Sequence, residues 1–489
     1  MSDSLNNRYQ NDLQNNGAGD AGDVEEWDVV VVGSGPAGQK AAVQGAKAGR
    51  RVCVIERDIG VGGACVRHGT IPSKALRETA LHLSEMRSRI GRHVEVELPP
   101  DLQLASLMDR MQAVVSAHVE YQGRQMERNG IEQMHGRASF VANDTIKVEG
   151  VRGDVRILRA PTIVVATGSR PRAPSHVAID HEHVYDSDSI LSMAYLPQSM
   201  VVLGGGVIAT EYATIFASLG AAVTIVDRYP RPLGFLDQEI LDRFVAHFEA
   251  RPGCSFLGEV EVQSVVWDGV SEVVTKLADG RELRSQKVLC AQGRIANVDS
   301  LAIEAAGLET NARGHIPVDE DCCTNVPGIY AVGDVIGPPS LASASMAQGR
   351  RAMRAALDLD CSGVQDLLPS GIYSIPEIST VGRTEAECRA DGVEVVVGRA
   401  RFQELARAQI AGSQHGLLKL VVAADDEQRI LGCQVFGEGA TELVHLAQMA
   451  MFNGNGVSVF IDNIFNFPTL AEAYRVAALD ATSKTVAGV

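Results

Sequence analysis

The chain has 489 residues, which is too long for one hydrophobic core and predicts two to four domains. Its formal charge of −17 argues against a nucleic-acid or anionic-membrane partner, and no apolar run approaches the ~20 residues that span a bilayer. Its nine cysteines show no C-x-x-C pair and no metal-ligand spacing, so we expect neither a structural disulfide nor a metal site. We place the adjacent Cys322 and Cys323 on opposite faces of a strand.

The N-terminal stretch is rich in Asn, Asp and Gly, a composition typical of disorder, and we expect a disordered tail over 1–27. The same stretch lacks the basic-then-apolar order of a secretory signal. We therefore expect a cytoplasmic protein.

A dinucleotide-binding pattern follows the tail. After the β-branched run 29–32, Gly33, Gly35 and Gly38 form a G-x-G-x-x-G motif. The first glycine permits the turn, the second lets a pyrophosphate approach a helix N-terminus, and the third lets that helix pack on the strand. A second strand ends at Glu56, whose carboxylate can accept hydrogen bonds from an adenosine ribose. The alternative, a glycine-rich turn without a ligand, is weakened by the two flanking strands and the acidic residue.

The same pattern returns with Gly204, Gly206 and Ala209 after a strand, then a helix, a second strand and Asp227. In both copies the acidic residue lies 23 positions after the first glycine. Two sites of this kind predict two cofactors, a flavin dinucleotide and a nicotinamide dinucleotide. The alternative is one working site and one decayed copy, but the second copy keeps every small residue that the pattern requires.

The stretch "VDRYPRPLGFLD" after the second copy places Asp227 beside Arg228, with Arg231 three positions further. A carboxylate accepts a hydrogen bond from the 2′-hydroxyl of NAD, and arginine binds the 2′-phosphate of NADP. Both charges together predict a site that accepts both nucleotides. In the alternative, the arginines point to solvent.

Further landmarks favour a flavin. A hydrophobic strand runs into Thr167 and Gly168, where a close backbone approach is expected. Another strand ends at Gly333 and Asp334, and the Asp334 carboxylate can bind a ribityl hydroxyl. The helix that follows, in "PSLASASMAQGRRAMRAAL", can stabilise charge on a reduced flavin with its positive N-terminus.

These motifs, with "GTIPSKALR", "YDSDSILSM", "FLDQE", "AVGDVIGPPSLASA", "GIYSIPEIS" and "FNFPTLAEAYRVAAL", resemble the two-dinucleotide-binding flavoprotein family of glutathione reductase and dihydrolipoamide dehydrogenase, from Trp27 to the C-terminus. Within it, the chain is most similar to the soluble pyridine nucleotide transhydrogenases. The resemblance implies an α/β fold with two Rossmann-like domains and an α+β dimerisation domain, FAD as cofactor, NAD and NADP as substrates, and a homodimer. It also implies domain boundaries: FAD binding at 28–180, NAD(P) binding at 181–295, a central domain at 296–360 and dimerisation at 361–489.

The resemblance also implies site residues. Lys74 and Glu211 match family positions that form an ion pair beside the reactive nitrogen of the flavin. Beyond the glycines and acidic residues above, the expected cofactor-binding set includes Arg57, Gly62, Gly63, Cys65, Ala342 and Gly293.

Two departures from the disulfide-reductase pattern change the expected reaction. The second redox cysteine aligns with Thr70, and the histidine of the C-terminal His-Pro aligns with Phe467, although Glu472 remains. Threonine forms no thiolate and phenylalanine carries no proton, so electron flow to a thiol substrate is lost. We favour a packed thiol for Cys65 over a lone redox thiol that cycles through sulfenic acid.

Electrons that enter such a flavin from one nicotinamide must leave to another acceptor. The expected reaction is a double displacement at one nicotinamide site, in which NADPH delivers hydride to FAD and NAD⁺ later removes it. An NAD(P)H-dependent quinone or dye reductase is the rival enzyme, and a non-catalytic subunit that keeps the fold as a scaffold is a rival of another class.

Overall fold

The computed structural model describes residues 24–90, 104–361 and 367–487, and these divide into two compact units. The first unit takes its described residues from 1–63, 119–169 and 296–361, and the second from 64–118, 170–295 and 362–489. The domain boundaries expected from the sequence remain a prediction, since the two units group the chain more coarsely.

The first unit contains an eight-stranded sheet whose central strands are parallel. Its central strand is buried at every position, as expected for an apolar run covered on both faces. In spatial order the strands are β1 (Val24–Glu26), β6 (Val155–Arg159), β5 (Thr145–Gly150), β4 (Glu132–Ala142), β3 (Val52–Glu56), β2 (Val29–Val32), β7 (Thr162–Val165) and β18 (Ile329–Ala331).

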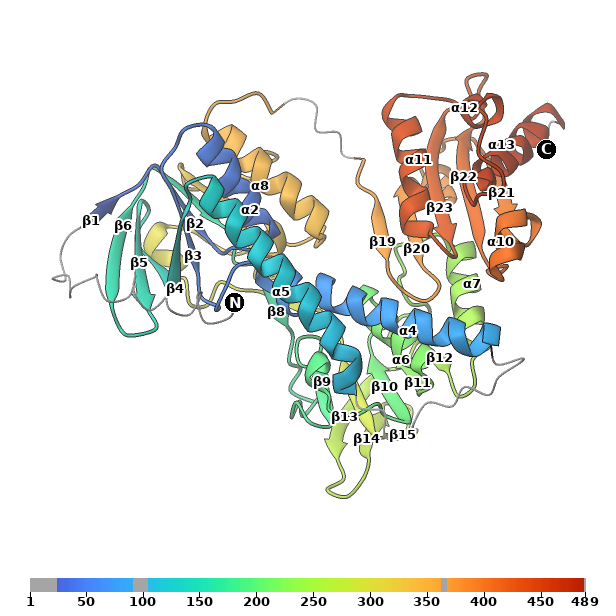
Figure 1. The fold of residues 1–489 in the computed structure, drawn as a ribbon, viewed down its shortest axis with the longest axis horizontal. Helices are drawn as coiled ribbons and strands as arrows, with labels where there is room; N and C mark the ends of the chain where they lie inside the picture. The colour runs from blue at the N-terminus through green and yellow to red at the C-terminus, as the bar shows by residue number, and fades with distance from the viewer. Residues whose placement is uncertain (1–23, 91–103, 362–366, 488–489) are drawn as a thin grey trace. The chain divides into compact units, whose positions relative to one another are not determined.

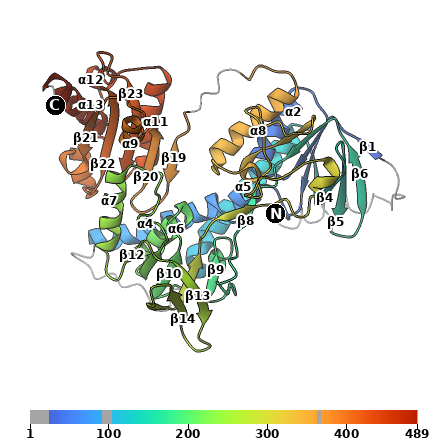
Figure 2. The ribbon, with the colours of Figure 1, turned by 180° about the vertical axis from the view of Figure 1, so that it is seen from behind.

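Two helices of the first unit, α2 (Pro36–Lys47) and α8 (Ala342–Ala356), pack closely on each other and lie side by side in Figures 1 and 2. The close approach requires Gly349, because a Cβ atom there would collide with the carbonyl oxygen of Ala37. The N-termini of both helices are thereby brought to the same part of the unit. A third helix, α5 (Leu104–Arg128), precedes β4 in the chain.

The end of the expected disordered tail, residues 24–27, is ordered in the structure. Residues 1–23 lie outside the described residues, but β1 lies within the range 1–27 and pairs with β6. Glu25 accepts two hydrogen bonds from Arg156, at 2.7 and 2.6 Å, and Trp27 is buried in the core. Residues 24–27 are therefore part of the folded first unit.

The nucleotide-binding part of the second unit is built on a five-stranded parallel sheet. Its strands are, in spatial order, β12 (Ser255–Leu257), β11 (Ala222–Val226), β10 (Ser199–Leu203), β16 (Lys287–Cys290) and β9 (Val184–Asp186). A small antiparallel sheet contains β13 (Val262–Trp267), β14 (Val273–Leu277) and β15 (Glu282–Ser285).

Helix α4 (Thr70–Ile90) belongs to this second unit, although the sequence places it in the flavin-binding domain. Its Leu76 and Ala80 pack in one apolar cluster with Tyr212 and Phe216 of α6 (Val207–Leu219). This packing brings Lys74, on α4, to the same region as α6.

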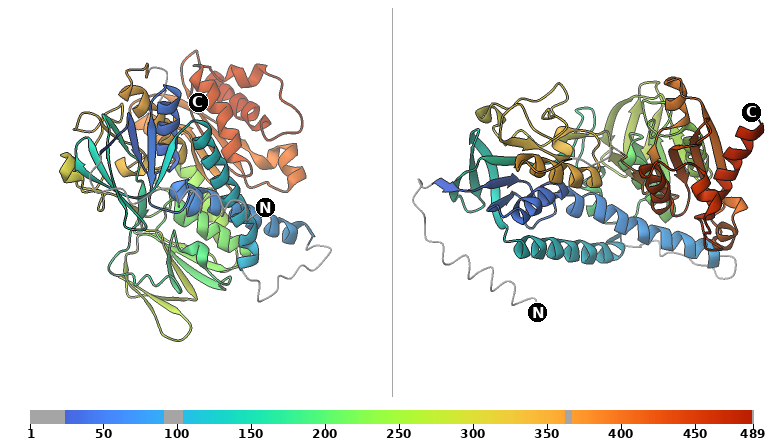
Figure 3. Two further views of the ribbon diagram at one scale, coloured as in Figure 1. Left: turned by 60° about the vertical axis from the view of Figure 1, so that its left-hand side comes forward. Right: turned by 90° about the horizontal axis from the view of Figure 1, so that it is seen from above.

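The C-terminal part of the second unit is a five-stranded antiparallel sheet, coloured orange to red in Figure 3. Helices α11 (Ala440–Phe452) and α13 (Glu472–Ala487) contribute to one apolar cluster with its strands, and α7 (Gln238–Glu249) contributes to another. The strands are β19 (Ser370–Ile372), β20 (Ile378–Gly382), β23 (Ile430–Phe436), β22 (Leu417–Ala423) and β21 (Val395–Arg401). The parallel and antiparallel sheets together confirm the predicted α/β class with an α+β C-terminal part.

The expected strand at Cys322 and Cys323 is wrong. Cys322 has a φ of 65° and donates its N–H to the carbonyl of Asp319 at 3.0 Å, and Cys323 donates its N–H to the Asp319 carboxylate at 2.8 Å. The Asp319 side chain thus closes a turn, which overrides the local strand pattern.

None of the nine cysteines forms a disulfide. Within 24–90, 104–361 and 367–487, no helix is long and apolar enough to cross a bilayer.

Candidate functional site

The first glycine motif has three glycines with three different surroundings. Gly33 has a φ of 104°, and a Cβ atom there would collide with the carbonyl of Ala166. A Cβ atom on Gly38 would collide with the carbonyl of Gly33, so this position requires glycine for close packing of helix on strand. A Cβ atom on Gly35 would meet nothing within 4 Å, and no side chain caps the N-terminus of α2 at this point. Open space in front of uncapped helix amides fits a pyrophosphate.

The second motif repeats this arrangement. Gly204 has a φ of 102°, and its Cβ atom would lie 2.7 Å from the carbonyl oxygen of Ala291. Gly206 faces open space and caps α6 without a side-chain hydrogen bond. The third position is Ala209, which is completely buried. The second copy therefore also keeps an open cradle at a helix N-terminus.

The acidic residues of the two motifs lie beside their glycine turns. Glu56 Oε2 accepts hydrogen bonds from the backbone N–H and the hydroxyl of Ser34, at 2.9 and 2.6 Å. In the second copy, Gly205 replaces the serine, and a Cβ atom there would collide with Asp227 Oδ2. Each carboxylate thus lies against the second residue of its glycine turn.

Gly62 and Gly63 close over the first turn. Gly62 donates its N–H to the Ser34 hydroxyl at 3.1 Å, and a Cβ atom on Gly63 would lie 2.9 Å from the Cα atom of Gly35. Cys65 follows in α3 (Gly63–Arg67). The neighbouring Arg57 is half exposed and lies 3.8 Å from a carboxylate oxygen of Asp58.

The remaining expected flavin residues lie in the first unit. Thr167 and Asn297 exchange two hydrogen bonds, at 2.8 and 2.9 Å, and Gly168 has a φ of 67° that favours glycine. Asp334 Oδ2 accepts a hydrogen bond from the Ser169 hydroxyl at 2.6 Å.

Gly333 and Ala342 connect this region to the two packed helices. A Cβ atom on Gly333 would lie 3.3 Å from the Cβ atom of Ala37 on α2, and the Gly333 N–H donates to Gln348 of α8 at 2.9 Å. Ala342 is the first residue of α8. The structure therefore gathers the first motif, Asp334 and the start of α8 into one region.

Lys74 and Glu211 form an ion pair, with 2.7 Å between Nζ and Oε2. The other oxygen of Glu211 accepts the backbone N–H of Tyr373 at 2.8 Å, and Lys74 Nζ lies 5.0 Å from the centre of the Tyr373 ring. Burial raises the pKa of the Tyr373 phenol. Sequence reasoning missed Tyr373, because its contact is made through the backbone.

The arginines after Asp227 differ in their contacts. Arg228 is exposed, donates to the Tyr229 hydroxyl at 2.9 Å and stacks on that ring, whereas Arg231 forms an ion pair with Asp242. Gly293, with a φ of 101°, accepts the N–H of Arg172 at 3.0 Å.

Near the C-terminus, Phe467 departs from the reductase pattern and Glu472 keeps it. Phe467 is 75 % exposed, and Glu472 begins α13 and accepts the Thr469 N–H at 3.4 Å. Among the described residues, no group of three or more His, Cys, Asp or Glu side chains has the arrangement of a metal site.

Models of known families match nearly the whole chain. The model described as pyridine nucleotide-disulphide oxidoreductase matches residues 27–349, and the dimerisation domain of the same family matches 368–478. The chain belongs to the pyridine nucleotide-disulphide oxidoreductase family. The resemblance inferred from the sequence is confirmed.

Two relatives in this family are named soluble pyridine nucleotide transhydrogenase. The protein from Mycobacterium tuberculosis is 43% identical over 94% of this chain and 98% of its own length, and that from Chromohalobacter salexigens is 41% identical over 94% and 99%. Two solved structures are similar to this chain over nearly its whole length. LpdA from M. tuberculosis has a TM-score of 0.86 at 26% identity, covering 93% of this chain and 99% of its own. The HOCl-induced flavoprotein disulfide reductase RclA from Escherichia coli has a TM-score of 0.82 at 27% identity, covering 93% and 99%.

Proposed function

We propose that this chain is a FAD-dependent soluble pyridine nucleotide transhydrogenase that catalyses NADPH + NAD⁺ ⇌ NADP⁺ + NADH. The observation that carries the proposal is a pair of intact glycine cradles in a chain that has Thr70 where a redox disulfide would need its second cysteine. The names of the relatives support the same activity.

The first cradle fits FAD. Helix amides in front of Gly35 would hold the pyrophosphate, Glu56 the adenosine ribose, and Asp334 a ribityl hydroxyl. Ser34 and Ser169 donate to these two carboxylates and hold them in place. When bound, FAD supplies the chemistry of accepting a hydride from one nicotinamide and giving it to another. The proposed FAD site is completed by residues around these contacts, namely Arg57, Gly62, Gly63, Cys65, Thr167, Gly168, Gly333 and Ala342.

The second cradle fits a nicotinamide dinucleotide. Helix amides in front of Gly206 would hold the pyrophosphate, and Ala209 lets α6 pack on the strand that leads into Gly204. We assign Asp227 to the 2′-hydroxyl of NAD, and Arg228 with Arg231 to the 2′-phosphate of NADP. Gly293 leaves room beside this site, because a Cβ atom there would enter open space.

Lys74 and Glu211 are the proposed catalytic pair. Glu211 is held on both oxygens, so it keeps the Lys74 ammonium in one place. A fixed positive charge that faces a ring receiving hydride stabilises the negative charge that develops there. Cys65 keeps the role of a packed thiol, since Thr70 cannot complete a disulfide.

A homodimer is part of the proposal, because the family's dimerisation domain is present. Apolar side chains that a partner would cover are exposed on α11, namely Leu446, Met449 and Phe452, and in the segment before α13, namely Ile464 and Phe467. We further propose a cytoplasmic enzyme with no nucleic-acid or membrane partner, in keeping with its negative charge.

The test compares electron acceptors. Purified yellow protein with NADPH should produce NADH from NAD⁺ faster than it reduces quinones or dyes. Faster turnover with quinones would favour the reductase, and a colourless protein would favour a non-catalytic scaffold. For a double displacement, double-reciprocal plots of the initial rate against one nucleotide, at several fixed concentrations of the other, should give parallel lines.

A further inference from the structure

The segment 228–237, here called the ribose-side segment, runs from Asp227 to α7. Within it, the backbone N–H of Leu233 donates to the carbonyl of Gly205 at 2.7 Å, which ties the segment to the glycine turn. Leu233 has a φ of 52°, a conformation that a leucine keeps only where its surroundings hold it. Whatever holds Leu233 therefore also shapes the nucleotide site.

The apolar side of the ribose-side segment packs on the C-terminal sheet. Leu233 and Leu236 belong to one buried cluster with Ile372, Leu417 and Phe436 of that sheet. Helix α7, which follows the segment, contacts β23 of the same sheet. The segment is thus clamped between the glycine turn and the C-terminal sheet.

A buried lysine of the C-terminal sheet fixes the end of the segment. Leu418 and Leu420 of β22 belong to the cluster with α11 and α13, so strand alternation directs Leu417 and Lys419 to the α7 side. Lys419 Nζ lies 2.8 Å from Asp237 Oδ2, and the two side chains are only 3 % and 5 % exposed. Asp237 is also the N-cap of α7, where it accepts the Glu239 N–H at 3.0 Å.

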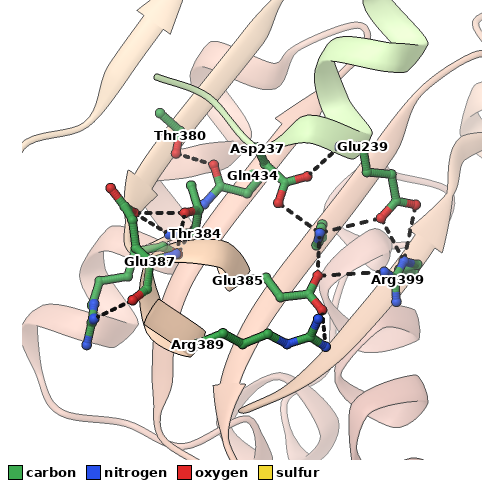
Figure 4. A network of polar contacts seen from close by, with 11 residues as sticks. Asp237, Glu239, Thr380, Thr384, Glu385, Glu387, Arg389, Arg399 and Gln434 are labelled. Atoms are coloured by element: carbon green, nitrogen blue, oxygen red, sulfur yellow. Dashed lines mark hydrogen bonds and ion pairs between the residues drawn. The ribbon is translucent and has the colours of Figure 1, made fainter. Parts of the chain in front are cut away.

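The ion pair is the centre of a network with equal numbers of positive and negative side chains. Figure 4 labels its members Asp237, Glu239, Glu385, Arg389 and Arg399. Lys419 also lies 2.8 Å from Glu385 and 3.5 Å from Glu239, while Arg399 lies 2.9 Å from Glu239 and Arg389 pairs with Glu385 at 2.6 Å. Burial opposes the charge of Lys419, but the hydrogen bonds that Lys419 donates to Asp237 and Glu385 outweigh burial and raise the pKa of this lysine. Lys419 is therefore a permanently charged anchor.

We propose that Lys419 is a positioning residue that holds the ribose-side segment in the conformation that binds the 2′-phosphate, and so sets the affinity for NADP(H) relative to NAD(H). The inference rests on the proposed function. Arg228 and Arg231 lie within the segment, and ordering them in advance lowers the cost of binding. Asp227 is held separately, by a hydrogen bond from its N–H to the Leu257 carbonyl at 2.9 Å, so NAD(H) depends less on the anchor.

A purely structural role predicts something different. Buried ion pairs are weak evidence of stabilisation, and removing one partner costs stability because it leaves the other charge buried. Such a loss would lower the melting temperature without separating the two nucleotides. The ratio of the two affinities is therefore the informative readout.

The experiment uses the FAD-loaded enzyme and two variants. Asp237→Asn keeps the cap acceptor and the shape but removes the charge, and Lys419→Met removes the anchor. The dependence of flavin reduction on nucleotide concentration gives an apparent Kd and a limiting rate separately. For Lys419→Met we expect the Kd of NADPH to rise about tenfold and that of NADH less than about twofold, with limiting rates within about twofold. Asp237→Asn should change in the same direction by about threefold.

Lys484→Met is the matched control. Lys484 also lies in the C-terminal part, where it pairs with Asp480 and donates to the Val397 carbonyl, but it does not touch the ribose-side segment. This variant should leave both constants unchanged. If Lys419→Met does not fold, Asp237→Asn decides. Equal changes for both nucleotides, or an unchanged NADPH constant in a folded variant, would overturn the proposal.

The double variant Arg228→Ala with Arg231→Ala separates this inference from the proposed function. If it weakens NADPH selectively while Asp237→Asn does not, only the role of Lys419 fails. If it affects both nucleotides equally, the proposed 2′-phosphate site itself is wrong.

Discussion

Lys74 forms an ion pair with Glu211, and both carboxylate oxygens of Glu211 accept hydrogen bonds. Its Nζ atom lies 2.7 Å from Glu211 Oε2, and the second oxygen of Glu211 accepts the Tyr373 N–H. Glu211 is 6 % exposed, whereas Lys74 is 25 % exposed. The buried carboxylate therefore acts as the support, and the lysine is the member that a bound ligand can reach.

Lys74→Met should slow flavin reduction at saturating NADPH by about 10- to 100-fold, because it removes the positive charge of the proposed catalytic pair. Rapid-reaction absorbance measures this rate directly. Lys276→Met, at an exposed position on β14, serves as the control and should keep the wild-type rate. A Lys74→Met enzyme that reduces its flavin at the wild-type rate would remove the pair from the mechanism.

Thr70→Cys alone should gain no turnover of disulfide substrates, even if it forms a disulfide with Cys65. Phe467 supplies no base for the dithiol, so only Thr70→Cys combined with Phe467→His should show a gain. NADPH oxidation with lipoamide or glutathione disulfide measures it, with Thr70→Ser as the control. Robust disulfide reduction by the single variant would contradict this account.

The double variant Arg228→Ala with Arg231→Ala should weaken NADP(H) binding by about 1.5–3 kcal/mol, one to two orders of magnitude, for lost bonds to a charged group. NAD(H) should change little, and Asp227→Ala should show the opposite preference. In the structure Arg231 is engaged with Asp242, so Asp242→Asn should leave Arg231 freer to bind the phosphate. The apparent Kd of each nucleotide tests this.

Glycine positions could be predicted from the sequence because the requirement is local. The turn at Gly33 is a local conformation with a φ of 104°, and a Cβ atom on Gly38 would collide with the nearby carbonyl of Gly33. Gly204 repeats the turn, with a φ of 102°. The cysteine pair shows the limit of local pattern, since the Asp319 side chain imposes a turn where alternation suggested a strand.

Contacts between distant segments could not be predicted where the resemblance did not imply them. Lys419 and Asp237 are 182 positions apart, and Tyr373 reaches Glu211 across 162 positions through a backbone N–H that every residue but proline possesses. For the Lys419–Asp237 pair, the sequence signal is a lone lysine inside the apolar run "LLKLVV". Such a lysine indicates a buried charge but not which residue pairs with it.

The pH dependence of stability should reflect His247 on α7. Burial, with Arg251 and His415 nearby, lowers the pKa of His247 to about 4. The unfolded chain, with a pKa of about 6.5, takes up the proton first as the pH falls, so stability is lost progressively from about pH 6.5 down to about 4. His247→Gln should reduce the drop in melting temperature between pH 7 and 5 by about 2 °C. Exposed His445→Gln should keep the wild-type drop, and an equal drop in His247→Gln would contradict the assignment.

Hydride transfer between two nicotinamides without any third acceptor is the central claim. Anaerobic stopped-flow mixing of the purified protein with about one equivalent of NADPH, followed by NAD⁺ alone, tests it most directly. We predict that NADPH bleaches the flavin absorbance and that NAD⁺ restores it, with about one NADH formed per bound FAD. A flavin that stays reduced with NAD⁺ and is reoxidised only when a quinone is added would contradict the account.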